Sequence, residues 1–107
     1  MYGIIFKCGL LGYNYLVGVL KMPIISEFYG IKIMMFWNEH YPPHFHAEYG
    51  HNKILVDIQN ATVLKGVFPS RQLKLVLAWC EIHKDELMRN WDNGRENNQF
   101  IKINPLI

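Results

Sequence analysis

The sequence predicts an α+β domain in which an antiparallel sheet of about four strands carries one long amphipathic helix packed on one face. Two observations lead to this fold class. Several short segments rich in β-branched and aromatic residues are separated by turn residues, and they precede one long segment with apolar residues at helical spacing. With 107 residues, 50% of them apolar, the chain can bury a single core.

The first strand is expected at Phe28 to Trp37, which is rich in β-branched and aromatic residues. The segments 44–49 and 53–58 each alternate in polarity, which is typical of strands with one buried face. We expect them to form a hairpin, because a two-residue loop at His51-Asn52 keeps both apolar sets on the same side of the sheet.

A further strand is expected at Val63 to Phe68 and a last one at Phe100 to Ile103. Between them a helix is expected to begin with Ser70 as its N-cap and to end before Gly94. A second apolar stripe on this helix is either additional core or a partner surface, and we expect core. The main stripe, which should face the sheet, comprises Leu73, Val76, Leu77, Cys80, Leu87 and Trp91, and the second comprises Leu75, Trp79 and Ile82.

Residues 1–21 differ from the rest of the chain, since they include four glycines and only Lys7 is charged before Lys21. We expect Met22 to start a single domain, 22–107, and residues 1–21 to be an upstream extension of the reading frame. The alternative is an extra edge strand or a partner-binding arm. The uncharged run within this segment is shorter than the roughly 20 residues of a membrane span, so no membrane partner is expected.

Charge and cysteine content limit the classes of function. Without Lys7 and Lys21, nine basic residues face nine acidic ones, so nucleic-acid binding would require a local patch. Cys8 and Cys80 are far apart in the sequence and suggest neither a disulfide framework nor a cysteine-rich zinc site, which favours a cytoplasmic location. The absence of a phosphate-binding glycine loop or a GxSxG motif argues against nucleotide hydrolysis and serine-hydrolase chemistry.

The strongest chemical signal is the segment 40–46, His-Tyr-Pro-Pro-His-Phe-His, which holds three of the five histidines. Two consecutive prolines interrupt strand pairing and form a stiff corner. His40 would then lie at the end of one strand, at a defined distance from His44 and His46 at the start of the next. The expected hairpin register places Asp57 opposite His46, so a carboxylate would join the cluster from the neighbouring strand.

Three interpretations of this cluster stay open. His44 and His46 project from one strand face and are able to share a divalent metal such as zinc, with His40 or Asp57 as the third ligand. Alternatively, His44 and His46 act as catalytic proton donor and acceptor, while one of two basic side chains binds a phosphate. In the third interpretation the histidines are polar surface residues at a packed corner. The phosphate-binding candidates are Lys53 and Arg71.

Four segments, 26–31, 40–46, 48–50 and 75–79, resemble the small prokaryotic proteins of the domain-of-unknown-function 4160 family, over residues 22–106. The segment 59–62 departs from that pattern, since similar proteins tend to carry a glycine-containing turn there. The resemblance implies a neighbouring gene for a small cognate protein, in a pair like a toxin-antitoxin module. We therefore expect an interaction component of such a pair, with RNA as a second candidate partner and a homo-oligomer as a compatible state. The alternative is a metal-dependent or histidine-based hydrolase of phosphodiester bonds, similar to a ribonuclease.

Overall fold

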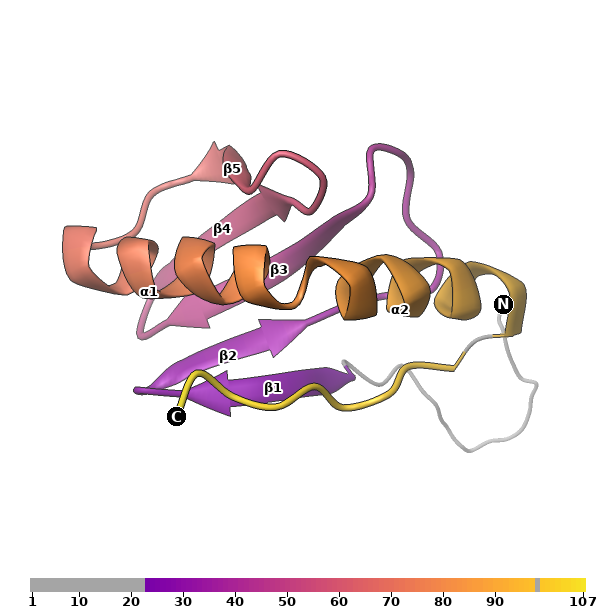
Figure 1. Cartoon of the computed structure of the whole chain (residues 1–107). Coiled ribbons are helices and arrows are strands. Elements are labelled where there is room, and N and C mark those ends of the chain that lie inside the picture. The colour runs from indigo at the N-terminus through magenta and orange to yellow at the C-terminus, as the bar shows by residue number, and fades with distance from the viewer. Residues whose placement is uncertain (1–22, 98) are drawn as a thin grey trace, which may run out of the picture.

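The computed structural model describes residues 23–97 and 99–107, so the expected leader, residues 1–21, lies outside the described residues. Within these described residues, five strands pair in sequence order as an antiparallel sheet, and two helices follow one another across one face of it (Figure 1). The elements are β1 (Ile24–Phe28), β2 (Ile31–Met34), β3 (His44–Tyr49), β4 (Asn52–Asp57), β5 (Thr62–Gly66), α1 (Ser70–Ile82) and α2 (Lys84–Asn97).

The α+β class is confirmed, but the predicted first strand, Phe28 to Trp37, is wrong. The chain turns at Tyr29-Gly30, so that β1 and β2 form a hairpin and the sheet gains a strand. Both turn residues have positive φ angles, 49° for Tyr29 and 78° for Gly30. Two consecutive positive φ angles are the geometry of a tight hairpin turn, and tyrosine in the first position conceals the usual Asn-Gly signal.

The predicted hairpin of β3 and β4 is confirmed, with a different turn. Tyr49 pairs with Asn52, so the two loop residues are Gly50 and His51 rather than His51 and Asn52. Gly50 has a φ angle of +59°, which glycine adopts without the steric cost that a Cβ imposes.

This turn shifts the strand pairing by two residues from the predicted register. His46 lies opposite Leu55, and Asp57 lies opposite His44 instead of His46. Because side chains alternate with a period of two, a shift of two leaves every side chain on its predicted face. Phe45 lies opposite Val56 instead of Ile58, and both Phe45 and Val56 are fully buried in the core.

The predicted single long helix is two helices, with a break at His83. The backbone of His83 has φ −109° and ψ 24°, outside the helical region, and its imidazole packs on the Trp79 ring and bonds to Glu86. The predicted caps are also wrong. Pro69 occupies the N-cap position of α1 with no side-chain cap, and Ser70 is already helical.

Gly94 lies inside α2 rather than beyond its end, and packing explains why glycine stands there. A Cβ on Gly94 would lie 2.3 Å from the Cε1 atom of Phe100. The absence of a side chain therefore lets the C-terminal segment pack directly on the helix.

The core lies between the helices and one sheet face. The predicted main stripe is confirmed, because Val76, Cys80, Leu87 and Trp91 are buried and Leu73 and Leu77 pack against the same cluster. The residues of the second stripe differ in their burial. Trp79 is fully buried, whereas Ile82 is 65% exposed, so the expectation of core holds for the tryptophan and not for the isoleucine.

The segment 99–107 has no regular secondary structure, so the strand predicted at Phe100 to Ile103 is wrong. It runs beside β1 (Figure 1), and the amide of Ile103 donates to the carbonyl of Ile25. Asn90 of α2 bonds to both the amide and the carbonyl of Ile101, and the indole of Trp79 donates to the carbonyl of Asn104. One backbone hydrogen bond, from Ile103 to Ile25, thus joins this segment to β1, and side chains of the two helices hold the rest of it in place.

The thiol of Cys80 is expected to resist alkylation in the native state. Burial raises its pKa to about 11, and Sγ lies 3.7 Å from the carbonyl oxygen of Ile58. In a Cys8→Ser background, iodoacetamide at pH 8 should therefore label Cys80 only at the rate at which the chain opens.

The same shift predicts how stability depends on pH. The unfolded thiol ionises near its ordinary pKa of 9.0, while the folded thiol keeps its proton up to about 11. Stability contributed by the protonated thiol is thus present below pH 9 and lost as the pH rises towards 11. Urea denaturation at pH 8 and pH 10.5 checks this, since Cys80→Ala should lose less stability than the wild type over that interval.

Within the part of the chain that the structure describes, neither helix combines the length and the apolar composition required to cross a lipid bilayer.

Candidate metal centre

The histidine motif lies where the chain crosses from β2 to β3. The residues 35–43 form an irregular loop that ends in Pro42 and Pro43, with a cis peptide bond between Tyr41 and Pro42. Pro43 is buried, and its carbonyl accepts a hydrogen bond from the amide of Ile58. The loop is therefore tied to the end of β4 directly before His44 begins β3, as the stiff corner predicted from the sequence requires.

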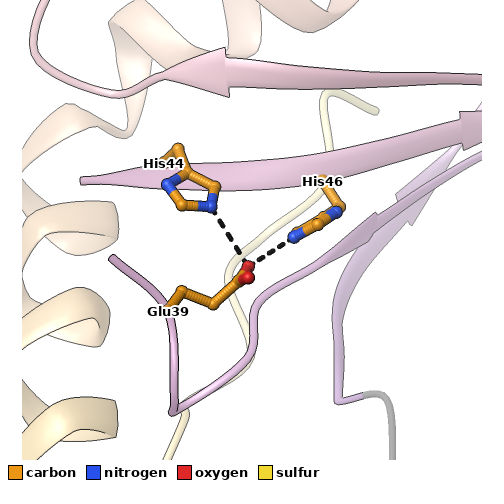
Figure 2. A group of neighbouring side chains, drawn as sticks. All are labelled: Glu39, His44 and His46. Atoms are coloured by element: carbon orange, nitrogen blue, oxygen red, sulfur yellow. Dashed lines mark hydrogen bonds and ion pairs between the residues drawn. The ribbon is translucent and has the colours of Figure 1, made fainter. Parts of the chain in front are cut away.

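Glu39 of this loop brings its carboxylate between the imidazoles of His44 and His46 (Figure 2). The Oε1 atom lies 3.1 Å from Nε2 of His44 and 2.5 Å from Nε2 of His46. The His44 side chain is 9% exposed, and those of His46 and Glu39 are 29% and 27% exposed. The cluster is thus sheltered on the His44 side and open to solvent on the other.

The Nε2 atom of His44 faces the Glu39 carboxylate, and the hydrogen bond made by the other ring nitrogen, Nδ1, shows whether Nε2 keeps a free electron pair. Nδ1 lies 2.8 Å from the carbonyl oxygen of Pro42, and a carbonyl only accepts, so Nδ1 carries a proton. A neutral His44 then presents a bare Nε2 to the oxygen of Glu39, and the two electron pairs repel each other. Either a second proton on Nε2 or a cation between Nε2 and Oε1 removes this repulsion.

The surroundings orient both rings further. The His46 and Phe36 rings form a T-shaped pair with their centroids 4.7 Å apart, and the His44 ring packs on Trp91 of α2 with a centroid distance of 5.2 Å. These contacts hold the two Nε2 atoms towards the same point. Together with Oε1, they lie within 4.8 Å of one another, which is a spacing that one metal ion can close.

Two of the four predicted metal ligands are not in this group. His40 adjoins Glu39 in the loop but is exposed and does not belong to the cluster. Asp57 lies opposite His44, yet its carboxylate accepts the amides of Gln59 and Asn60 and the side-chain amide of Asn60. Its oxygens therefore stabilise the turn between β4 and β5 rather than facing the imidazoles.

The predicted phosphate-binding residues also lie apart from the histidines. Lys53 lies opposite Glu48 in the hairpin, and its Nζ atom is 3.8 Å from the Glu48 carboxylate. Glu48 is four residues along β3 from His44, so this ion pair lies roughly 13 Å from the histidine. Arg71 is exposed in the first turn of α1, and no hydrogen bond or ion pair of its side chain occurs within the described residues. The structure therefore brings neither cation to the cluster.

Sequence reasoning missed Glu39. It directly precedes the motif, so a search for ligand types around the histidines would have included it. Its role depends on the path of the loop, and no local periodicity describes that path.

A second group of side chains docks the loop on α2. Arg95 donates from Nη1 to the carbonyl oxygen of Glu39 at 2.7 Å, and its guanidinium carbon lies 4.7 Å above the Tyr41 ring. The same carbon lies 5.6 Å from the Trp91 ring, which in turn contacts Tyr41 at 5.8 Å. A cation between two aromatic faces holds the loop in the position that presents the Glu39 carboxylate.

Comparison with known proteins adds the family. No curated protein and no solved structure matches the chain. The family model described as "Domain of unknown function (DUF4160)" matches residues 30–92, which is more than half of the chain and includes Glu39, both histidines and Trp91. The chain therefore belongs to the DUF4160 family, as the resemblance of its motifs implied.

Proposed function

We propose that Glu39, His44 and His46 bind one divalent metal ion, such as zinc, and that this ion serves the hydrolysis of phosphodiester bonds. The observation that carries the proposal is the state of His44. Its Nδ1 proton is held by the Pro42 carbonyl, which leaves the Nε2 electron pair directed at the point where the other two ligand atoms converge. Metal-binding histidines usually donate the N–H of their other ring nitrogen to a carbonyl or carboxylate in this way.

The ligand number supports a catalytic rather than a structural ion. Structural zinc sites are closed by four protein ligands, whereas catalytic sites use three and keep a position for water or substrate. Two histidines and one carboxylate occur in both zinc hydrolases and iron(II) oxygenases, so the donor set is compatible with either metal. The partial exposure of His46 and Glu39 leaves solvent access to an open position.

A phosphodiester is the substrate class we favour. A metal ion polarises a phosphoryl oxygen and lowers the pKa of a bound water to about 7, which supplies a nucleophile at neutral pH. The charge of the ion also offsets the charge that develops on the phosphoryl oxygens.

Elemental analysis of the untagged protein tests the proposal. We expect about one equivalent of metal in the wild type and none in the His44→Ala, His46→Ala double variant. A metal-free wild type, even after incubation with zinc, manganese or iron(II) and desalting, would refute the metal site. Hydrolysis of bis(p-nitrophenyl) phosphate that needs both histidines but survives a chelator would instead support the metal-free acid–base mechanism.

We propose as a second candidate that the chain is an interaction component of a toxin-antitoxin-like gene pair, and the outer edge of β5 supports this role. Among the residues that the structure describes, strand β5 pairs with β4 alone, and four of its five residues are exposed. Free strand edges bind partner strands through backbone hydrogen bonds. Co-expression with the neighbouring gene should yield a stable complex. Growth arrest that the neighbour relieves, and that the double histidine variant does not cause, would favour a catalytic toxin.

A further inference from the structure

Arg95 is held in a fixed position without an acidic partner. Its side chain donates one hydrogen bond to the Glu39 carbonyl and packs on the rings of Tyr41 and Trp91. No carboxylate lies within ion-pair distance of it among residues 23–97 and 99–107. A guanidinium has five N–H donors in a planar fork. An arginine that is held in place and whose other donors meet no acceptor in the described residues is suited to an anion that accepts two of them.

The Trp91 indole lies beside the guanidinium and carries a second donor with no acceptor in the described residues. Trp91 is 2% exposed, and its Nε1–H is buried with no hydrogen-bond acceptor in the described part of the chain. Burying an N–H without an acceptor is unfavourable because the group loses its hydrogen bond to water, so such groups are rare in folded proteins. The indole that carries this N–H contacts both the His44 ring and the guanidinium.

The guanidinium and the indole ring lie close to the proposed metal centre. Because His44 lies 5.2 Å and the guanidinium carbon 5.6 Å from the same indole ring, the two are at most about 11 Å apart. Glu39 contacts both groups, because its carboxylate faces the two histidines and its backbone carbonyl accepts a hydrogen bond from Arg95. A substrate held at the metal by one phosphate can therefore extend a neighbouring anionic group to Arg95.

We infer that Arg95 and the indole N–H of Trp91 form a subsite for the phosphate that flanks the cleaved bond. This inference rests on the proposed function and specifies its substrate as a chain with consecutive phosphates, as in a nucleic-acid strand, rather than an isolated diester. The exposed ring of Tyr41, 65% accessible, provides a stacking face beside the subsite.

Binding of small ribonucleotides to chelator-treated protein tests the subsite apart from the metal. The probes are the dinucleotide UpU and its forms with an added 5′ or 3′ phosphate. One phosphorylated form should bind the wild type about tenfold more tightly than UpU, which is the scale of a charge-assisted hydrogen bond. Arg95→Gln removes the guanidinium and should abolish this preference.

Arg89→Gln is the matched control, because Arg89 is an exposed arginine of the same helix with no ion pair in the described residues. It should keep the preference in full. Trp91→Phe keeps a ring and removes the N–H, so it should reduce the preference while circular dichroism confirms the fold. Equal preference in the wild type and Arg95→Gln, or equal losses in both arginine variants, would overturn the subsite. A phosphate preference that depends on Arg95 in a protein that binds no metal would refute the proposed function and leave the subsite standing.

Discussion

Replacing Glu39 by glutamine is expected to weaken zinc binding by at least about 100-fold. Loss of a residue that only orients a ligand already costs 10- to 100-fold in metal affinity, and Glu39 is proposed as a ligand itself. The amide oxygen of glutamine is neutral and a weaker donor to zinc. In the described cluster the carboxylate is the group that contacts both Nε2 atoms, so glutamine removes the negative charge that faces the two imidazoles.

Competition with a chromophoric chelator measures this affinity. The control is Glu48→Gln, which changes a carboxylate on β3, the strand of the two histidines, whose one ion pair in the described residues is with the exposed Lys53. It should leave zinc binding within about threefold of the wild type, since it removes a surface ion pair of little energetic value. Zinc affinity that falls equally in both variants, or in neither, would remove Glu39 from the metal centre. Thermal melts of the metal-free proteins separate lost ligation from lost folding.

Trp79→Ala is expected to lower the free energy of unfolding by about 4 kcal/mol, the largest loss of stability that we predict. The Trp79 ring is fully buried and packs on Phe28 at 5.4 Å and on Phe45 at 5.7 Å. Its indole N–H also donates to the carbonyl of Asn104, so the substitution both opens a cavity and frees the C-terminal segment. Urea denaturation followed by far-ultraviolet circular dichroism measures the loss.

Two variants complete this experiment. Trp37→Ala removes a tryptophan that is 44% exposed and should change stability by only about 0.5 kcal/mol. Trp79→Phe keeps an aromatic ring but loses the bond to Asn104, and its cost should fall between the other two. Similar losses for Trp79→Ala and Trp37→Ala would show that Trp79 is not a central core residue.

Much of the fold was predictable because local periodicity reports which face of an element is buried. The alternation in β3 and β4 correctly predicts that Phe45 and Val56 share the core face, even though the predicted turn is one residue out. A helix break at His83 and a turn at Tyr29-Gly30 were not predictable in the same way. Each depends on backbone angles that the surrounding packing stabilises, against the ordinary preference of the residues involved.

The candidate site was likewise predictable only in the features that depend on neighbouring residues. The spacing of His44 and His46 places both imidazoles on one strand face, and the prolines before them predict the stiff corner, because both effects act within a few residues. Whether a carboxylate meets those imidazoles is decided by a loop whose path depends on distant contacts. Sequence reasoning therefore chose Asp57, the nearest carboxylate by strand register, and the turn after β4 uses that group instead.

The sequence by itself determined the α+β class, the buried faces of the strands and helices, and the position of the histidine pair. Only the tertiary structure decided that Glu39 completes the cluster. That placement depends on Arg95, 56 residues further along the chain, whose side chain bonds to the Glu39 carbonyl and rests on the Tyr41 and Trp91 rings. Periodicity describes how neighbouring residues share a face, whereas a contact between a loop and a remote helix exists only once the sheet and helices have packed.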